Sequence, residues 1–108
     1  MYDAIIYLVK KKDTKTVDEY GDKVFKDELR EIYAEVMSVR QSEFYQAQTA
    51  GYKPEIVFKI ADYLDYENES EVIHEKMRYK VLRIYRKGVE LEITCYGGVR
   101  DEYTKVGD

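Results

Sequence analysis

Hydrophobic and polar positions in the first part of the chain follow the two-residue period of extended structure. Residues 3–10 contain an unbroken apolar run, which predicts a strand that is covered on both faces. The polar stretch at residues 13–21 predicts a turn or loop, which can include a short strand at residues 16–19. Apolar and polar residues then alternate over residues 24–39, so one long strand with a single buried face is predicted there.

The pattern changes over residues 40–50, which are good helix formers with little β-branching. Ser38 and Gln41 have the spacing of a capping box, which marks the start of a helix. Gly51 can adopt the left-handed conformation that commonly ends a helix. We therefore expect one short α-helix around residues 41–50.

Further stretches with a strand pattern follow one another closely, at residues 54–64, 71–75, 79–86 and 89–96. The last two are joined by Arg86-Lys87-Gly88, which is typical of a short hairpin turn. The sequence thus predicts a mainly β chain of about six antiparallel strands with one inserted helix. Such a chain is expected to close into a small β-barrel or sandwich, an arrangement that protects the sheet edges.

Composition agrees with one compact unit. The chain has 108 residues, which fits a single domain at 1–108, and its 44% hydrophobic content is too high for a disordered chain. The only cysteine, Cys95, excludes an intrachain disulfide and a zinc site built on several cysteines. The apolar run near the start lacks the features of a signal peptide and is too short to span a bilayer. We expect a soluble protein made in the cytoplasm, with no membrane partner.

Residues that could carry out catalysis or bind a metal lack the patterns that these functions need. His74, the one histidine, lies in a short predicted strand and is interpreted as facing solvent or a partner, not as a general base. Cys95 lies on the apolar face of its strand and is assigned to the core. Carboxylates from Asp62 to Glu71 lack the spacing of a calcium loop and are interpreted as a solvated hairpin loop. We therefore predict no catalytic residues, no cofactor and no metal.

Charge and tyrosine content favour protein contacts over nucleic-acid binding. The net charge is −4, whereas free nucleic-acid binders usually carry a basic stripe. A local basic cluster of Lys10, Lys11, Lys12 and Lys15 is interpreted as a solvated loop. The 12 tyrosines suit interfaces, although tyrosine is also a good strand residue. An OB-like β-barrel that stacks bases on exposed tyrosines is kept as an alternative.

One segment is more distinctive than the strands. It reads Ser38-Val39-Arg40-Gln41-Ser42-Glu43-Phe44-Tyr45-Gln46-Ala47, followed by Gly51-Tyr52-Lys53-Pro54-Glu55 and Phe58. Together with Asp62-Tyr63 and the strand patterns at residues 79–85 and 89–91, it resembles the head–tail joining proteins of tailed bacteriophages and prophages. These proteins are also called head closure, head completion or stopper proteins. The resemblance covers roughly residues 29–96, which is most of the chain, and departs from the family in two turns, at residues 75–78 and at Asn68-Glu69, where glycine is common.

The resemblance implies a β-barrel or sandwich with a structural role and no catalysis. Family members form an oligomeric ring in the virion neck, which closes the DNA channel after packaging and offers the tail its attachment surface. The implied partners are neighbouring copies of the chain, the portal or adaptor (connector) protein, and a tail-completion or tail terminator protein. Double-stranded DNA would pass without sequence-specific binding, since an acidic lumen repels phosphates. The protein would be made in the bacterial host cytoplasm and end in the virion neck.

Within this hypothesis, residues 40–54 are expected to contact neighbouring subunits or the adaptor. The candidate interface residues are Arg40, Glu43, Phe44, Tyr45, Gln46, Tyr52, Lys53 and Pro54. Phe44 and Ala47 have the alternative role of packing the predicted helix onto the barrel. A prophage-encoded protein-interaction module without a place in the neck is a further alternative.

Overall fold

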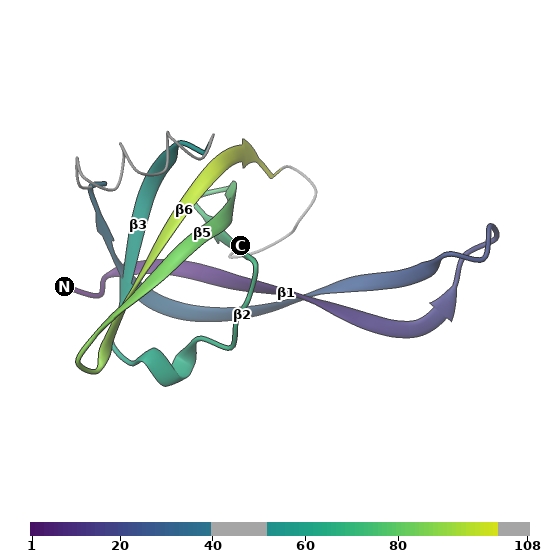
Figure 1. The fold of residues 1–108 in the computed structure, drawn as a ribbon, viewed down its shortest axis with the longest axis horizontal. Helices are drawn as coiled ribbons and strands as arrows, with labels where there is room; N and C mark the ends of the chain where they lie inside the picture. Colours follow the sequence, from purple (N-terminus) through teal and green to yellow (C-terminus); the bar gives the residue numbers. More distant parts are fainter. Residues whose placement is uncertain (40–51, 102–108) are drawn as a thin grey trace.

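A computed structural model describes residues 1–39 and 52–101, which form a barrel with a long projecting hairpin (Figure 1). The strands are β1 (Ala4–Val17), β2 (Lys23–Met37), β3 (Pro54–Ile60), β4 (Glu71–His74), β5 (Met77–Lys87) and β6 (Glu90–Arg100). All neighbouring strands are antiparallel, and the sheet closes in the order β1-β2-β3-β6-β5-β4. The predicted mainly β barrel of six antiparallel strands is confirmed.

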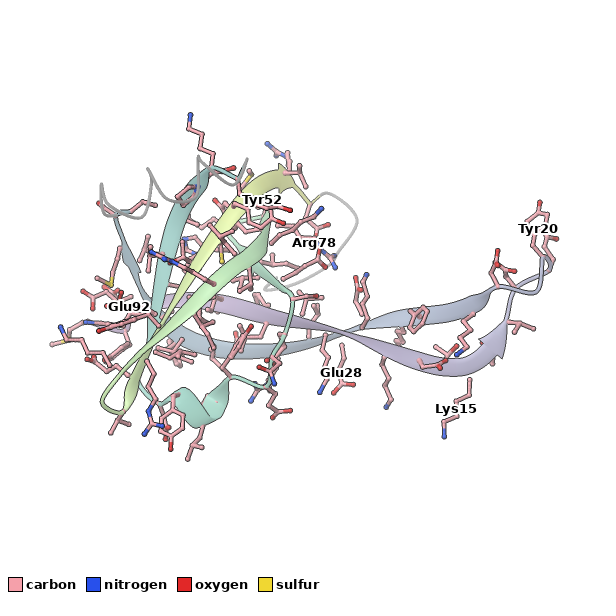
Figure 2. All side chains as sticks on the ribbon, in the orientation of Figure 1. Lys15, Tyr20, Glu28, Tyr52, Arg78 and Glu92 are labelled. Atoms are coloured by element: carbon pink, nitrogen blue, oxygen red, sulfur yellow. The ribbon has the colours of Figure 1, made fainter. Side chains whose placement is uncertain are left out.

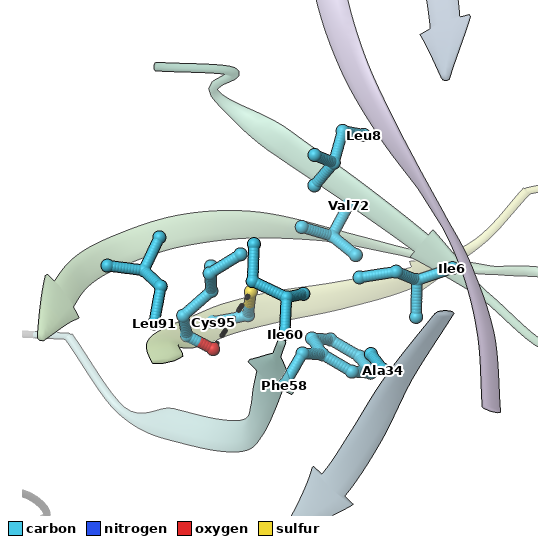
Figure 3. Close-up of a cluster of buried hydrophobic side chains, with 9 residues drawn as sticks. Ile6, Leu8, Ala34, Phe58, Ile60, Val72, Leu91 and Cys95 are labelled. Atoms are coloured by element: carbon cyan, nitrogen blue, oxygen red, sulfur yellow. Dashed lines mark hydrogen bonds between the residues drawn. The ribbon is translucent and has the colours of Figure 1, made fainter. Parts of the chain in front are cut away.

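The barrel interior is filled with apolar side chains that alternate with outward-facing residues along the strands (Figure 3). The buried cluster consists of Ile6, Leu8, Ala34, Phe58, Ile60, Val72, Leu91, Ile93 and Cys95. Tyr79 and Val81 of β5 pack against this cluster, so every strand contributes to the core. Burying an aliphatic or aromatic side chain contributes about 1.5–3 kcal/mol to the free energy of folding. The burial of this cluster therefore stabilises the closed barrel.

β1 and β2 continue well beyond the barrel as a two-stranded hairpin, which we call the arm (residues 10–28; Figure 1). β1 pairs with β4 only from Tyr7 to Val9, and β2 pairs with β3 only at residues 35–37. Farther out, β1 and β2 pair with each other as far as the Val17–Lys23 pair. The arm therefore shares the strands of the barrel but lies outside its core.

The arm corrects the loop predicted at residues 13–21. β1 runs on to Val17, and only residues 18–22 connect the two strands. The register shifts between Asp13 and Val17, where Lys15 has a φ of 60°. Because neither face of the outer part of β1 meets the core, this part carries no apolar alternation and resembles a polar loop.

The remaining elements follow the prediction with small shifts. β3 ends at Ile60, because Asp62 accepts a hydrogen bond from the Leu64 backbone N–H and begins the 3₁₀ helix η1 (Tyr63–Asp65). Gly88 and Val89 form the turn between β5 and β6, one residue later than predicted, with a φ of 64° at Gly88. The helix predicted around residues 41–50 lies outside the described residues.

The turns at which the sequence departs from the head–tail joining pattern use left-handed backbone without glycine. Glu75 and Lys76 form a two-residue turn between β4 and β5, with φ angles of 49° and 64°. Asn68 has a φ of 63°, which asparagine tolerates better than most residues. Among the described residues, no helix has the length and apolar character needed to cross a membrane.

Candidate functional site

The described candidate interface residues lie at the start of β3. Tyr52 is 46% exposed, and its ring packs edge-on against Tyr96 of β6, with 4.9 Å between the ring centroids. Lys53 is exposed, whereas Pro54 is buried and is paired with Tyr96 in the sheet. Tyr52 and Lys53 are thus exposed at the surface, while Pro54 is part of the sheet. The other candidates, Arg40, Glu43, Phe44, Tyr45 and Gln46, lie outside the described residues.

The arm is a second surface, which sequence reasoning missed. Figure 2 shows Glu28, Lys15 and Tyr20 at increasing distances from the barrel along the arm. Phe25 is 55% exposed and Tyr20 is 82% exposed, and Val24 is exposed beside them. Large apolar side chains on a projecting element are typical of a protein-binding surface. The signal for this surface in the sequence was the adjacent apolar pair Val24-Phe25. The residues around this pair are polar and offer it no apolar face to pack against.

One face of the arm is basic. Lys12 of β1 lies directly opposite Lys26 of β2, so both side chains leave the same face of the ladder. Lys10 follows on that face, opposite Glu28. The cluster predicted to sit in a solvated loop is exposed but belongs to strand β1; it consists of Lys10, Lys11, Lys12 and Lys15. Like charges directly opposite each other are destabilising, and an anionic partner would relieve the repulsion.

The other face of the arm is tied to the barrel by ion pairs at its root. Lys11 hydrogen-bonds to the carboxylate of Asp27 across the hairpin. Arg78 of β5 contacts Asp27 at 3.0 Å and Glu71 of β4 at 2.7 Å, and lies 3.6 Å from Asp101. The hydrogen bond from Lys11, followed by that from Arg78, lowers the pKa of Asp27. These contacts fix the direction in which the arm leaves the barrel.

A third surface, the acidic segment (residues 62–75), contains several carboxylates and no lysine or arginine. Leu64 is 69% exposed in η1, and the neighbouring side chains of Asp65 and Glu67 are exposed as well. Glu69 is 3% exposed and accepts a 2.8 Å hydrogen bond from Arg30 of β2. The prediction of a solvated loop is therefore wrong for Glu69. Its carboxylate is buried and fixes the loop to β2 through the hydrogen bond from Arg30.

The acidic segment is held in place from two sides. On one side, Glu69 also accepts a 2.6 Å hydrogen bond from the Glu67 backbone N–H. On the other, the Tyr63 N–H donates to the Val89 carbonyl at 2.7 Å, and the Arg86 guanidinium lies 3.5 Å from the centre of the Tyr63 ring. The exposed carboxylates and Leu64 are thus presented by an ordered segment.

The two residues with potential reactivity both serve packing. The His74 ring lies edge-on to Phe58, with 5.3 Å between the ring centroids, and its side chain is 12% exposed, so the ring is largely covered within the chain; the alternative that it faces a partner stays a prediction. Cys95 is fully buried in the core, as predicted, and burial raises the pKa of its thiol to about 12. A thiol with this pKa is protonated at neutral pH and is a poor nucleophile. Residues 1–39 and 52–101 contain no cluster of histidine, cysteine and carboxylate groups that could hold a metal ion.

A surface hollow of about 360 Å³ lies where the arm joins the barrel. Its described lining consists of Lys11, Ser70, Glu71, Lys80, Val81 and Tyr96. Small-molecule sites are usually lined by apolar and aromatic side chains with a few convergent polar groups. The charged lining here is more typical of a surface that contacts another protein.

No family model matches this sequence, and no curated protein matches it. What the protein does is therefore inferred from its own residues: the distinctive segment at residues 40–54, the closed barrel, the exposed arm and the acidic segment.

Proposed function

We propose that this protein is a structural protein of a phage or prophage virion neck. It forms a ring beneath the portal and adaptor, closes the DNA channel after packaging and offers the tail its attachment surface. The observation that carries the proposal is the segment at residues 38–55, in which Ser-Glu-Phe-Tyr and Lys-Pro-Glu resemble the head–tail joining family. The closed six-stranded barrel is in keeping with the fold that this resemblance implies.

A ring subunit needs interfaces, and the described surfaces are suited to that need. Tyr52 and Lys53 are exposed within the distinctive segment, immediately before β3. The arm projects apolar and basic side chains away from the core. Cys95, in contrast, is buried in the core, and the His74 ring packs against Phe58. This division favours a role in assembly, without catalysis or a cofactor.

The charge of the chain supports a place around DNA without tight binding. The net charge of −4 would make the lumen of a ring repel phosphates, so that DNA slides and does not adhere. The partners of this proposal are neighbouring copies of the chain, the portal or adaptor protein, and a tail-completion or tail terminator protein. Assembly would begin in the host cytoplasm and end in the virion neck.

The test is the solution mass of the purified protein, alone and with the portal–adaptor complex, measured by light scattering after size exclusion. The proposal expects the protein to join the complex as a ring. Replacing Tyr52 and Lys53 with alanine should weaken this binding, whereas Lys87→Ala, in the distant β5–β6 hairpin, should not. A stable protein that never joins the complex would overturn the proposal.

A small nucleic-acid-binding barrel is the second candidate. The observation that favours it is the exposed basic face of the arm, where Lys12 and Lys26 lie opposite each other beside Lys10. Binding to a labelled oligonucleotide should then fall steeply as salt is raised, because released counterions drive such binding. Lack of binding even at low salt would remove this candidate.

A further inference from the structure

We propose that the arm docks, through its basic face and its apolar side chains, onto the acidic segment (residues 62–75) of a second copy of this chain. The inference deepens the proposed function and rests on it only in taking the neighbouring copy of a ring as the partner. The contact joins two different surfaces, so it repeats head to tail and can close a ring.

The arm is incomplete as an isolated element. A two-stranded hairpin is at best marginally stable in water unless a further strand or a packed face supports it. Within the described part of the chain, the outer edge of β1 has no strand partner from residue 10 to residue 17. The exposed Val24 and Phe25 likewise have no core to cover them. A protein surface laid against the basic face would cover Val24 and could also pair with the outer edge of β1, whereas Phe25 points to the opposite face.

The two surfaces match in charge and in apolar content. The arm offers Lys10, Lys12 and Lys26 on one face, together with the exposed side chain of Val24. The acidic segment offers the exposed carboxylates of Asp65, at the end of η1, and of Glu67, which also lies 3.4 Å from Arg30, together with Leu64. Docking would bring lysines to carboxylates and cover apolar side chains on both partners. It would also relieve the repulsion between Lys12 and Lys26.

The outer part of the arm lies away from η1 of its own chain, although Lys11 at the root borders Ser70 and Glu71. Figure 1 shows the arm leaving the barrel on one side and extending away from η1. Its root is fixed in that direction by the contacts of Asp27 with Lys11 and Arg78. The acidic segment is in turn held to the barrel by the bond between Arg30 and Glu69. The pairing is therefore between copies.

A second copy fits the arm better than DNA does. The tip of the arm carries Asp18, Glu19 and Asp22, and lysines and carboxylates are equal in number over residues 10–28. Such a balance gives little net attraction for phosphates. The exposed Phe25 and Tyr20 need a protein surface if they are to be buried. Both complementary surfaces are also encoded in the same chain, so each copy supplies what its neighbour lacks.

The experiment measures self-association of the full chain by sedimentation velocity over a range of concentrations, at low and high salt. Wild type should associate at low salt, and high salt should weaken the association. The arm-reversed variant (Lys12→Glu with Lys26→Glu) and the acid-reversed variant (Asp65→Lys with Glu67→Lys) should each associate about tenfold more weakly. A mixture of the two variants should regain association, because the acidic arm of one then meets the basic segment of the other. Lys76→Glu with Lys87→Glu is the matched control and should behave like wild type.

Each outcome decides the inference. A wild type that is monomeric at every concentration and both salts, or an arm-reversed variant that associates like wild type, would overturn it. An arm-reversed variant that loses only oligonucleotide binding would assign the arm to DNA and also overturn it. Because binding to the portal–adaptor complex is measured separately, failure of the arm contact is distinguishable from failure of the proposed function. Circular dichroism melting of each variant confirms that it is folded.

Discussion

At the scale of single residues, Gly98 in β6 occupies a place that admits no side chain. A Cβ there would lie 2.5 Å from Cε1 of Tyr79 and 3.0 Å from a carboxylate oxygen of Glu55. The Gly98 N–H donates to Glu55 at 3.0 Å, and the Tyr79 ring packs edge-on against Phe58 in the core. Gly97 beside it has a φ of 64° where the register with β5 shifts, as in a β-bulge. The bulge brings the backbone of β6 against an aromatic side chain.

Gly98→Ala should therefore destabilise the barrel by about 1–3 kcal/mol, the usual effect of forcing an extra methyl group into a packed site. The measurement is the midpoint of urea unfolding. Tyr79→Leu provides the control, because the double variant should lose less than the sum of the two single effects if the ring is the obstacle. A Gly98→Ala protein with the wild-type midpoint would contradict this account.

Asp27 makes stability depend on pH. Its pKa is lowered in the folded protein, first by the hydrogen bond from Lys11 and then by Arg78. A carboxylate with a lowered pKa stabilises the fold above its unfolded-state pKa and loses that effect as the pH falls through the folded value. Wild type should therefore be more stable than Asp27→Asn at neutral pH, by about 1 kcal/mol or less because the pair is partly exposed.

This difference should shrink as the pH falls below about 4, the ordinary pKa of an aspartate. Urea midpoints of the two proteins, measured across the acid range, give the result. Asp65→Asn, at an exposed carboxylate, is the comparison. A gap between wild type and Asp27→Asn that remains constant at acid pH would show that the ion pairs at the arm root do not stabilise the fold.

At the scale of elements, the sequence predicts the strands that have a buried face and misjudges those that do not. Burial imposes the two-residue period, so the strands of the barrel were placed to within a few residues. The outer part of β1 has solvent on both faces, and its polar residues resemble a loop. Likewise, nothing local to Glu69 indicates that Arg30, distant in sequence, recruits it into the structure. The interfaces predicted at residues 40–54 stay a prediction.

The arm should be separable from the barrel. Replacing residues 12–26 with Asn-Gly, a sequence that favours a tight hairpin turn, keeps the pair between Lys11 and Asp27 and the whole core. The shortened chain should unfold cooperatively with a nearly unchanged melting temperature, while self-association is lost. Calorimetry and sedimentation velocity measure the two properties. Loss of cooperative unfolding would show instead that the barrel depends on the arm.

At the scale of the whole molecule, closure of the barrel determines where assembly can occur. The six strands pair around the ring, so the edges in the barrel wall are largely used within the chain. Among the described residues, the outer edge of β1 that has no strand partner lies on the arm, together with the exposed side chains of Val17, Tyr20, Val24 and Phe25. The molecule thus combines a stable core with contact surfaces that lie outside it, and the surfaces can change without loss of the fold.

Under the proposed neck function, the two surfaces should consequently be exchangeable in the phage that encodes the chain. Reversing the arm alone, with Lys12→Glu and Lys26→Glu, should prevent ring closure and lead to accumulation of tailless heads, counted by electron microscopy. Adding Asp65→Lys and Glu67→Lys to the same chain should restore tailed virions, because every copy then carries an acidic arm and a basic segment. Restoration by opposite charges is specific to a direct contact, since a variant that merely folds poorly would be made worse by further substitutions. Normal virions from the arm-reversed phage would show that the neck, if this protein builds it, is closed through other residues.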